Sequence, residues 1–229
     1  MIPFRLAILA TALGALPAST AAAQVTTVDE GSFSVTQNGR PIGREEFRIS
    51  SSPGTSGPIY VATANAVYDD RRLSPALRTD TSGAPIAYQI DVRDGAETQE
   101  RLTGQVGRGR FSARIQTPRG EAAREYLVSD GALVLDEDIY HQYYFLARRN
   151  RSGSVPVVIP RRNAQVVMHV TTKGREPVTI GGQTIDARHL VLTEPGGGVR
   201  DIDVDDQGRV LRVSIPARGI VALRDDPPR

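Results

Sequence analysis

The sequence predicts an all-β protein: an antiparallel meander of about a dozen strands, curled into a half-barrel or open barrel, with one helix capping or plugging it. Polar and apolar residues alternate along most of the chain, as they do in half-buried strands. Turn signals rich in Gly, Asp and Asn separate these short runs. One segment, residues 136–149, departs from the alternation and has helical spacing instead. Together these observations favour a curled sheet with a single helical insertion.

Residues 1–23 are predicted to be a secretory signal. Arg5 supplies the positive charge, and the apolar run 6–16 is too short to span a membrane. The small residues Ala21-Ala22-Ala23 form a cleavage pattern, which places cleavage between Ala23 and Gln24. We therefore expect a periplasmic or secreted protein whose mature chain has no transmembrane anchor.

The mature chain is predicted to form one β-meander domain over residues 24–224, followed by a disordered tail over 225–229. The whole chain of 229 residues carries a formal charge of +2, and removal of Arg5 lowers it to +1. A charge this close to zero, together with export, argues against nucleic acid as a partner. The chain contains no cysteine, which excludes disulfides, iron–sulfur clusters and thiol nucleophiles.

The first part of the mature chain is predicted to contain eight strands, because apolar residues recur at every second position. Turn sequences divide them, and the first, Asn38-Gly39, favours the positive φ of a tight hairpin. The predicted strands are 32–36, 42–50, 58–68, 75–81, 86–93, 98–106, 110–117 and 122–128.

The segment 136–149 is predicted to be the helix. Acidic residues open it and arginines close it, as the helix dipole favours, and it contains neither Gly nor Pro. Ile139, Tyr143 and Leu146 follow the i, i+4, i+7 spacing of one helical face. A loop over 151–160 is expected to follow it.

The alternation then resumes to the end of the chain. Asp201, Asp203 and Asp205 resemble a calcium loop, but the sixth and twelfth positions hold Asp206 and Arg212 instead of Gly and Glu. We interpret this run as a strand with a solvated face. The predicted strands are 163–172, 177–180, 184–193, 199–204, 210–215 and 220–223.

Several segments resemble a group of uncharacterised bacterial periplasmic proteins, catalogued as domains of unknown function: Gly31–Val35, Gly39–Phe47, the segment from Asp136 to Gly153, Val204–Val210 and Ile215-Pro216. The resemblance implies a long curled sheet, similar in outline to lipoprotein-carrier half-barrels that hold an acyl chain. It offers no catalytic residues, and any transport role that it implies is an analogy between folds.

Five arginines surround the predicted loop that follows the helix. Guanidinium groups match carboxylate and phosphate groups in a bidentate manner, so an anionic head group is a reasonable ligand. Ordinary surface charge in an arginine-rich chain is the alternative, since 27 of the 28 basic residues are arginine. The five candidates are Arg148, Arg149, Arg151, Arg161 and Arg162.

Three tyrosines of the predicted helix, Tyr140, Tyr143 and Tyr144, form a stripe. Such amphipathic rings line cavities in some proteins, so the stripe is a second candidate for ligand binding. The same stripe also suits a helix face that simply packs on the core, and both interpretations stay open.

The sequence contains no pattern that identifies a catalytic, metal or cofactor site. His141, His169 and His189 lack the spacing of metal ligands, and no nucleophile elbow is present. Glu45 and Glu46 are adjacent on a strand, so their side chains point to opposite faces. We therefore expect a non-enzymatic protein without a cofactor.

The predicted function is binding of an amphipathic or lipid-like anionic ligand in the concavity of the sheet. A structural or interaction module of the cell envelope is the first alternative, because exposed strand edges can accept a strand from a partner protein. A hydrolase is the second alternative, and it would require clustered carboxylates or a serine–histidine pair.

Overall fold

The computed structural model describes residues 24–229, and the predicted signal peptide over 1–23 lies outside the described residues. The described chain forms one 15-stranded sheet. Its first half consists of β1 (Thr26–Gln37), β2 (Arg40–Ser52), β3 (Ile59–Tyr68), β4 (Arg71–Thr79), β5 (Pro85–Asp94), β6 (Glu97–Gly107), β7 (Arg110–Thr117) and β8 (Gly120–Leu127). Its second half consists of β9 (Leu133–Val134), β10 (Gly153–Ile159), β11 (Ala164–Ile180), β12 (Gln183–Thr193), β13 (Val199–Val204), β14 (Val210–Ile215) and β15 (Ile220–Arg224).

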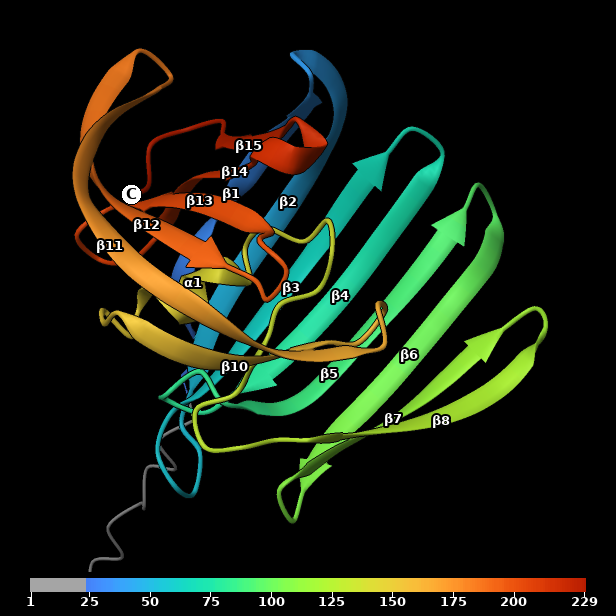
Figure 1. Ribbon diagram of the computed structural model, residues 1–229. Coiled ribbons are helices and arrows are strands. Elements are labelled where there is room, and N and C mark those ends of the chain that lie inside the picture. Colours follow the sequence, from blue (N-terminus) through green and yellow to red (C-terminus); the bar gives the residue numbers. More distant parts are fainter. Residues whose placement is uncertain (1–23) are drawn as a thin grey trace, which may run out of the picture.

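Two antiparallel meanders join where the first and last strands meet. The strand order is β8-β7-β6-β5-β4-β3-β2-β1-β15-β14-β13-β12-β11-β10-β9, and β9 is parallel to β10. The sheet curls so that the second half faces the first (Figure 1). This confirms the predicted all-β fold, a curled open sheet with a lone helix.

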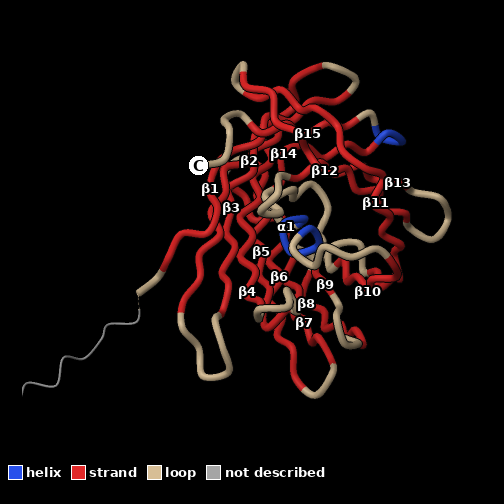
Figure 2. The backbone as a smooth tube through the Cα atoms, turned by 90° about the vertical axis from the view of Figure 1, so that its left-hand side faces the viewer, coloured by secondary structure: helices blue, strands red, loops and turns tan. Residues whose placement is uncertain are grey.

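A buried segment, residues 132–147, fills the concavity of the sheet, and we call it the plug. The helix α1 (Tyr143–Ala147) lies in the plug and is surrounded by strands (Figure 2). Every residue of the plug except Glu137 and Asp138 is buried. The large side chains with the least exposure come from the sheet and from the plug: Phe33, Ile49, Leu73, Leu77, Tyr88, Ile90, Leu102, Phe111, Leu133, Ile139, Tyr140 and Ile159.

The helix is shorter than the predicted range of 136–149 because the sheet binds the backbone and side chains of its first half. Asp138 has a positive φ of 60°, a left-handed conformation that interrupts a right-handed helix. The backbone N–H groups of Tyr140 and His141 donate to the Glu45 carboxylate, 2.6 and 3.0 Å away, rather than to a helical carbonyl. Tertiary contacts thus override the helical spacing of the sequence.

Three further elements differ from the prediction. The expected loop over 151–160 contains β10, whose valines are buried. The predicted strands 163–172 and 177–180 are one long strand, β11, with an irregularity between Thr172 and Gly174. The two-residue strand β9 has too few residues for a period to be visible in the sequence.

Side-chain hydrogen bonds link β8 to the beginning of β11 and to the turn before it. The Gln165 amide donates to the Leu127 carbonyl at 2.5 Å and accepts from the Leu127 N–H at 3.0 Å, as a neighbouring peptide group would. The hydroxyl of Tyr126 and the guanidinium of Arg124 both donate to the Pro160 carbonyl. These hydrogen bonds hold the β8 end of the sheet against its second half.

The C-terminal residues that were predicted to form a disordered tail, 225–229, follow β15 directly. The Asp225 carboxylate accepts hydrogen bonds from the hydroxyls of Ser32 and Ser34, both at 2.6 Å, and pairs with Arg44 at 2.8 Å. These contacts attach the beginning of this segment to β1 and β2.

Candidate functional site

A pocket of about 400 Å³ lies where the end of α1 meets two turns of the sheet. One turn joins β4 to β5, and the other follows β8. Gly83 permits the close approach, because its φ is +80° and a Cβ atom there would lie 3.1 Å from the Cβ of Phe145. The lining residues are Thr81, Ser82, Gly83, Gly131, Phe145, Arg148, Arg149 and Arg151. Three of the five predicted arginines thus share one pocket.

Arg149 holds the two turns and the helix together. Its Nε donates to the Ser82 carbonyl at 3.1 Å, and its terminal nitrogens donate to the carbonyls of Gly131 and Ala132. Burial lowers the pKa of the Arg149 guanidinium, and the nearby charge of Arg151 lowers this pKa further. Arg149 is therefore a positioned cation that builds the wall of the pocket.

Arg148 and Arg151 are exposed, and neither pairs with a carboxylate among the described residues. The Arg148 guanidinium lies over the Tyr60 ring, 4.5 Å from its centroid, and 5.8 Å from the centroid of Tyr144. This cation–π packing positions Arg148 without using its hydrogen-bond donors. The pocket therefore presents positive charge with unused donors.

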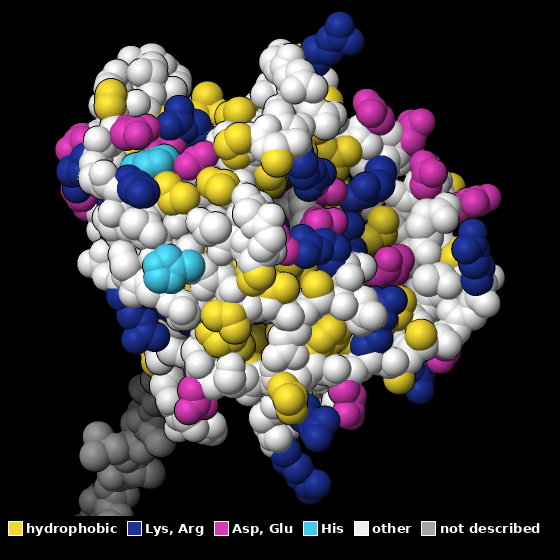
Figure 3. All heavy atoms as spheres, viewed as in Figure 1, with side chains coloured by type: hydrophobic (Ala, Val, Ile, Leu, Met, Phe, Trp, Pro, Cys, Tyr) yellow, Lys and Arg dark blue, Asp and Glu magenta, His cyan; other side chains and the backbone are white. Residues whose placement is uncertain are grey.

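The remaining predicted arginines, Arg161 and Arg162, lie outside this pocket, so the five arginines do not face one ligand. Arg161 is mostly buried, and its Nε donates to Asp136 of the plug at 3.0 Å. Arg162 pairs with Glu194, beyond the turn that joins β10 to β11. Acidic and basic side chains are interleaved in this way over the face shown in Figure 3. Carboxylates already compensate the charges of these two arginines.

Glu194 makes this ion-pair network sensitive to acid. Hydrogen bonds from Arg162 hold the pKa of the Glu194 carboxyl below its ordinary value of 4.5, and Arg200 adds to the effect. A carboxyl with a lowered pKa in the folded state stabilises the protein above its ordinary pKa, and this contribution is lost as the pH falls through the folded-state value.

We predict that Glu194→Gln lowers the melting temperature at pH 7, and that the difference from the unmodified protein closes as the pH falls below 4.5. Thermal unfolding followed by circular dichroism at a series of pH values measures this difference. Glu125→Gln is the control, because the Glu125–Arg110 pair is exposed and should contribute little at any pH. A difference that persists undiminished at pH 3 would contradict the assignment.

The three predicted tyrosines belong to the buried part of the plug. Tyr140, Tyr143 and Tyr144 are exposed by 1%, 4% and 4%, and none of them lines the pocket. Burial raises the pKa of Tyr143 to about 12. Tyr144 contacts two residues of the pocket lining, Arg148 and Phe145. The structure thus places the stripe in the core.

The spacing of residues in the sequence did not reveal the buried Glu45–His141 pair, which attaches the plug to the sheet. Glu45 points inward and is fully buried, whereas its neighbour Glu46 is exposed, as strand alternation predicts. The Glu45 carboxylate pairs with His141 Nδ1 as well as with the two backbone N–H groups of the plug. These residues are 96 positions apart, so no local signal could reveal the pair.

The other two histidines lie in the second half of the sheet. His169 is exposed on β11, and His189 on β12 lies against acidic side chains. Among the described residues, Glu176, His189 and Asp203 are close enough together to hold a metal ion. The neighbouring strands of His169 and His189 do not bring the two histidines into register.

No protein-family model matches this sequence, and neither does any curated protein. Among solved structures, the chain is similar to a β-barrel-like protein of a domain of unknown function (DUF1849) from Brucella abortus. The likeness covers 89% of this chain and 97% of that chain, with a TM-score of 0.54 and 8% sequence identity. At this identity it concerns the fold: the chain is a β-barrel-like domain with a curled meander, as the sequence resemblance implied.

Proposed function

We propose that this protein binds a small anionic ligand through Arg148 and Arg151. The observation that carries the proposal is a pocket of about 400 Å³ in which these two exposed guanidinium groups have no carboxylate partner among the described residues. Arg149 adds fixed positive charge beside them. A carboxylate or phosphate group would supply the missing acceptors through charge-assisted hydrogen bonds.

The residues that line the pocket restrict the size and polarity of the proposed ligand. Phe145 is the only strongly apolar residue of the pocket, and the interior of the curl is filled by the plug. An apolar group of limited size can contact Phe145, whereas a long acyl chain finds no space in the described interior. The expectation of an amphipathic ligand is therefore narrowed to a compact one with an anionic group.

The double variant Arg148→Ser/Arg151→Ser is expected to lower the affinity for the ligand at least about tenfold. Hydrogen bonds to charged groups contribute about 1.5–3 kcal/mol each, and about 1.4 kcal/mol corresponds to a tenfold change. Isothermal titration calorimetry with inorganic phosphate and with a short-chain phosphatidic acid measures the loss and distinguishes a free anion from a lipid head group.

The matched control is Arg72→Ser/Arg119→Ser, which removes two exposed arginines remote from the pocket. This control should bind both probes as the unmodified protein does. Equal affinity in the pocket variant and the control would contradict the proposal. Arg149 is left in place in both proteins, because its loss would disturb the two turns that it joins.

We also propose that the protein acts in the periplasm. The signal pattern over residues 1–23 supports this location. Fractionation of expressing cells, with N-terminal sequencing of the exported form, tests it. The expected N-terminus is Gln24, and an uncleaved chain that stays in the cytoplasm would contradict export.

A second candidate function is an interaction module of the cell envelope, and the β8 edge favours it. The Leu127 N–H and carbonyl point away from β7 towards Gln165. Every second residue of a strand points its N–H and carbonyl to the same side, so the backbone groups at Glu121, Ala123 and Glu125 also point away from β7. A photo-crosslinking residue at Ala123 should therefore capture a partner protein. The same residue at Thr63, exposed on the interior strand β3, should not.

A further inference from the structure

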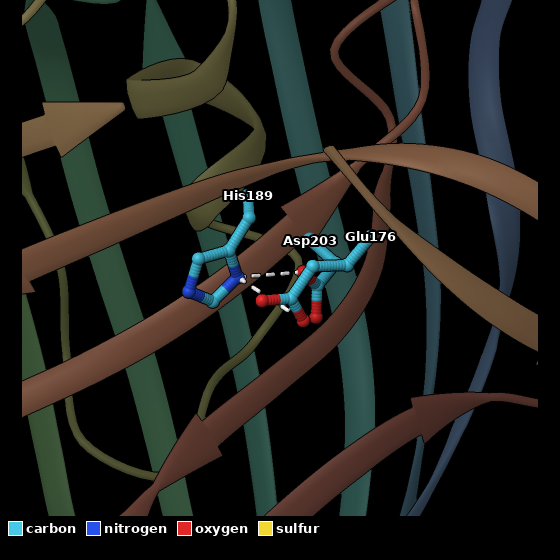
Figure 4. A group of neighbouring side chains, drawn as sticks. All are labelled: Glu176, His189 and Asp203. Atoms are coloured by element: carbon cyan, nitrogen blue, oxygen red, sulfur yellow. Dashed lines mark hydrogen bonds and ion pairs between the residues drawn. The ribbon is translucent and has the colours of Figure 1, made fainter. Parts of the chain in front are cut away.

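Three adjacent strands bring a histidine and two carboxylates together in the second half of the sheet. Glu176 lies on β11, His189 on β12 and Asp203 on β13, and Figure 4 shows their side chains pointing toward one another. His189 and Asp203 are direct partners in the ladder between β12 and β13. The Nδ1 atom of His189 is 2.8 Å from Asp203 Oδ1 and 4.0 Å from Glu176 Oε2. The ladders hold the backbones of the three residues on a rigid frame.

The groups around this cluster leave it negatively charged. Asp201 adds a third carboxylate, whose Oδ1 lies 3.5 Å from His189 Nε2. Arg212 is the one cation among residues 24–229 that pairs with the cluster: its Nε is 2.6 Å from Asp203 Oδ2, and its terminal nitrogen is 3.5 Å from Glu176 Oε2. Three carboxylates against one guanidinium leave a net charge of minus two with a neutral imidazole. A divalent cation would balance that charge.

We propose that Glu176, His189 and Asp203 form a binding site for a first-row divalent cation such as Zn²⁺. One imidazole nitrogen with carboxylate oxygens is a donor set that zinc uses, and the three ligand atoms lie within 4.8 Å of one another. Small side-chain movements would close these atoms around an ion. A three-ligand site leaves the fourth position of a tetrahedral ion for water.

The neighbouring residues suit the role of outer partners to a metal. In the ion-free protein Nδ1 of His189 donates to Asp203 Oδ1 at 2.8 Å, so an ion would replace this proton. Asp201, whose Oδ1 is 3.5 Å from Nε2, can then accept the hydrogen bond of an Nε2–H group and orient the ring. Arg212 occupies Oδ2 of Asp203 and leaves Oδ1 for the ion. Asp203 is fully buried, His189 is nearly so, and the Glu176 side chain is 49% exposed, so an ion would enter from the Glu176 side.

The test uses residues 24–229, which carry the complete sheet, without an affinity tag and after treatment with EDTA. Titration with ZnCl₂ in a calorimeter should show one ion bound per chain. His189→Ala should abolish this binding, and Asp201→Asn should weaken it about 10–100-fold, as the loss of an outer partner typically does. Circular dichroism of each variant confirms that it is folded.

Two further variants complete the test: one is a control outside the cluster, and the other changes only the exposed ligand. His169→Ala removes an exposed histidine of the neighbouring strand and should bind Zn²⁺ as before. Glu176→Gln changes the most exposed ligand, which leaves the buried pair intact, and should weaken binding. No stoichiometric binding by the unmodified protein, or equal binding by the His189 variant, would overturn the proposal. In that case the cluster is an ion-pair network between His189, Arg212 and the carboxylates.

Discussion

Replacing Glu45 with alanine is expected to lower the free energy of unfolding by about 3–5 kcal/mol, the usual cost of removing one partner of a buried pair. The fully buried Glu45 carboxylate accepts hydrogen bonds from the backbone N–H groups of Tyr140 and His141, and it pairs with His141 Nδ1. Alanine would leave all three groups buried without this acceptor. Urea unfolding followed by circular dichroism measures the loss.

Glu46→Ala is the matched control, because Glu46 follows Glu45 on the same strand but points to solvent. An exposed substitution of this kind changes stability by no more than about 0.5 kcal/mol. Equal stability losses in the two variants would show that the plug does not depend on the buried carboxylate. We also expect faster hydrogen exchange in residues 132–147 of the Glu45 variant, because Glu45 binds the backbone of the plug directly.

Replacing Arg224 with alanine is expected to cost a similar amount, about 3–5 kcal/mol, because it leaves the Asp29 carboxylate buried without its cation. The two terminal nitrogens of Arg224 donate to the two carboxylate oxygens of Asp29 at 3.1 and 2.8 Å, and both side chains are at most 3% exposed. Arg224 also donates to the Glu30 carbonyl. The pair joins the first strand to the last one.

The control for this prediction is Arg48→Ala, which breaks a pair with Glu30, the residue next to Asp29. Both side chains of that pair are more than half exposed, so its contribution to stability should be at most about 1 kcal/mol. Thermal and urea unfolding of both variants compare a buried and an exposed ion pair on neighbouring positions of β1. A smaller loss for Arg224 than for Arg48 would contradict the assignment.

The strand pattern could be predicted because it is local. Side chains alternate between the two faces of a strand, so the spacing of apolar residues marks both the strand and its buried face. The opposite orientations of Glu45 and Glu46 followed from this rule alone. The helix was predicted over too long a range, because its acidic first half has helical spacing but forms contacts with residues that are distant in the sequence.

The candidate site could be predicted only in part. The positions of Arg148, Arg149 and Arg151 near the end of one helix indicated that they lie close together, and they share a pocket. Arg161 and Arg162 are close to them in sequence, yet they pair with Asp136 and Glu194 instead. Whether an arginine pairs with a carboxylate depends on which residues lie beside it in the fold. A partner on a distant strand cannot be recognised from the neighbouring residues in the sequence.

The sequence by itself determined the all-β class, the turns, and the inward and outward faces of the strands, since each of these follows from neighbouring residues. Only the tertiary structure decided that residues 132–147 fill the concavity, which arginines remain without carboxylate partners, and that Glu176, His189 and Asp203 converge. The physical reason is that curling brings together strands that are far apart in the chain. Burying an unpaired charge costs free energy, so each buried charge pairs with an opposite charge that the curl places beside it.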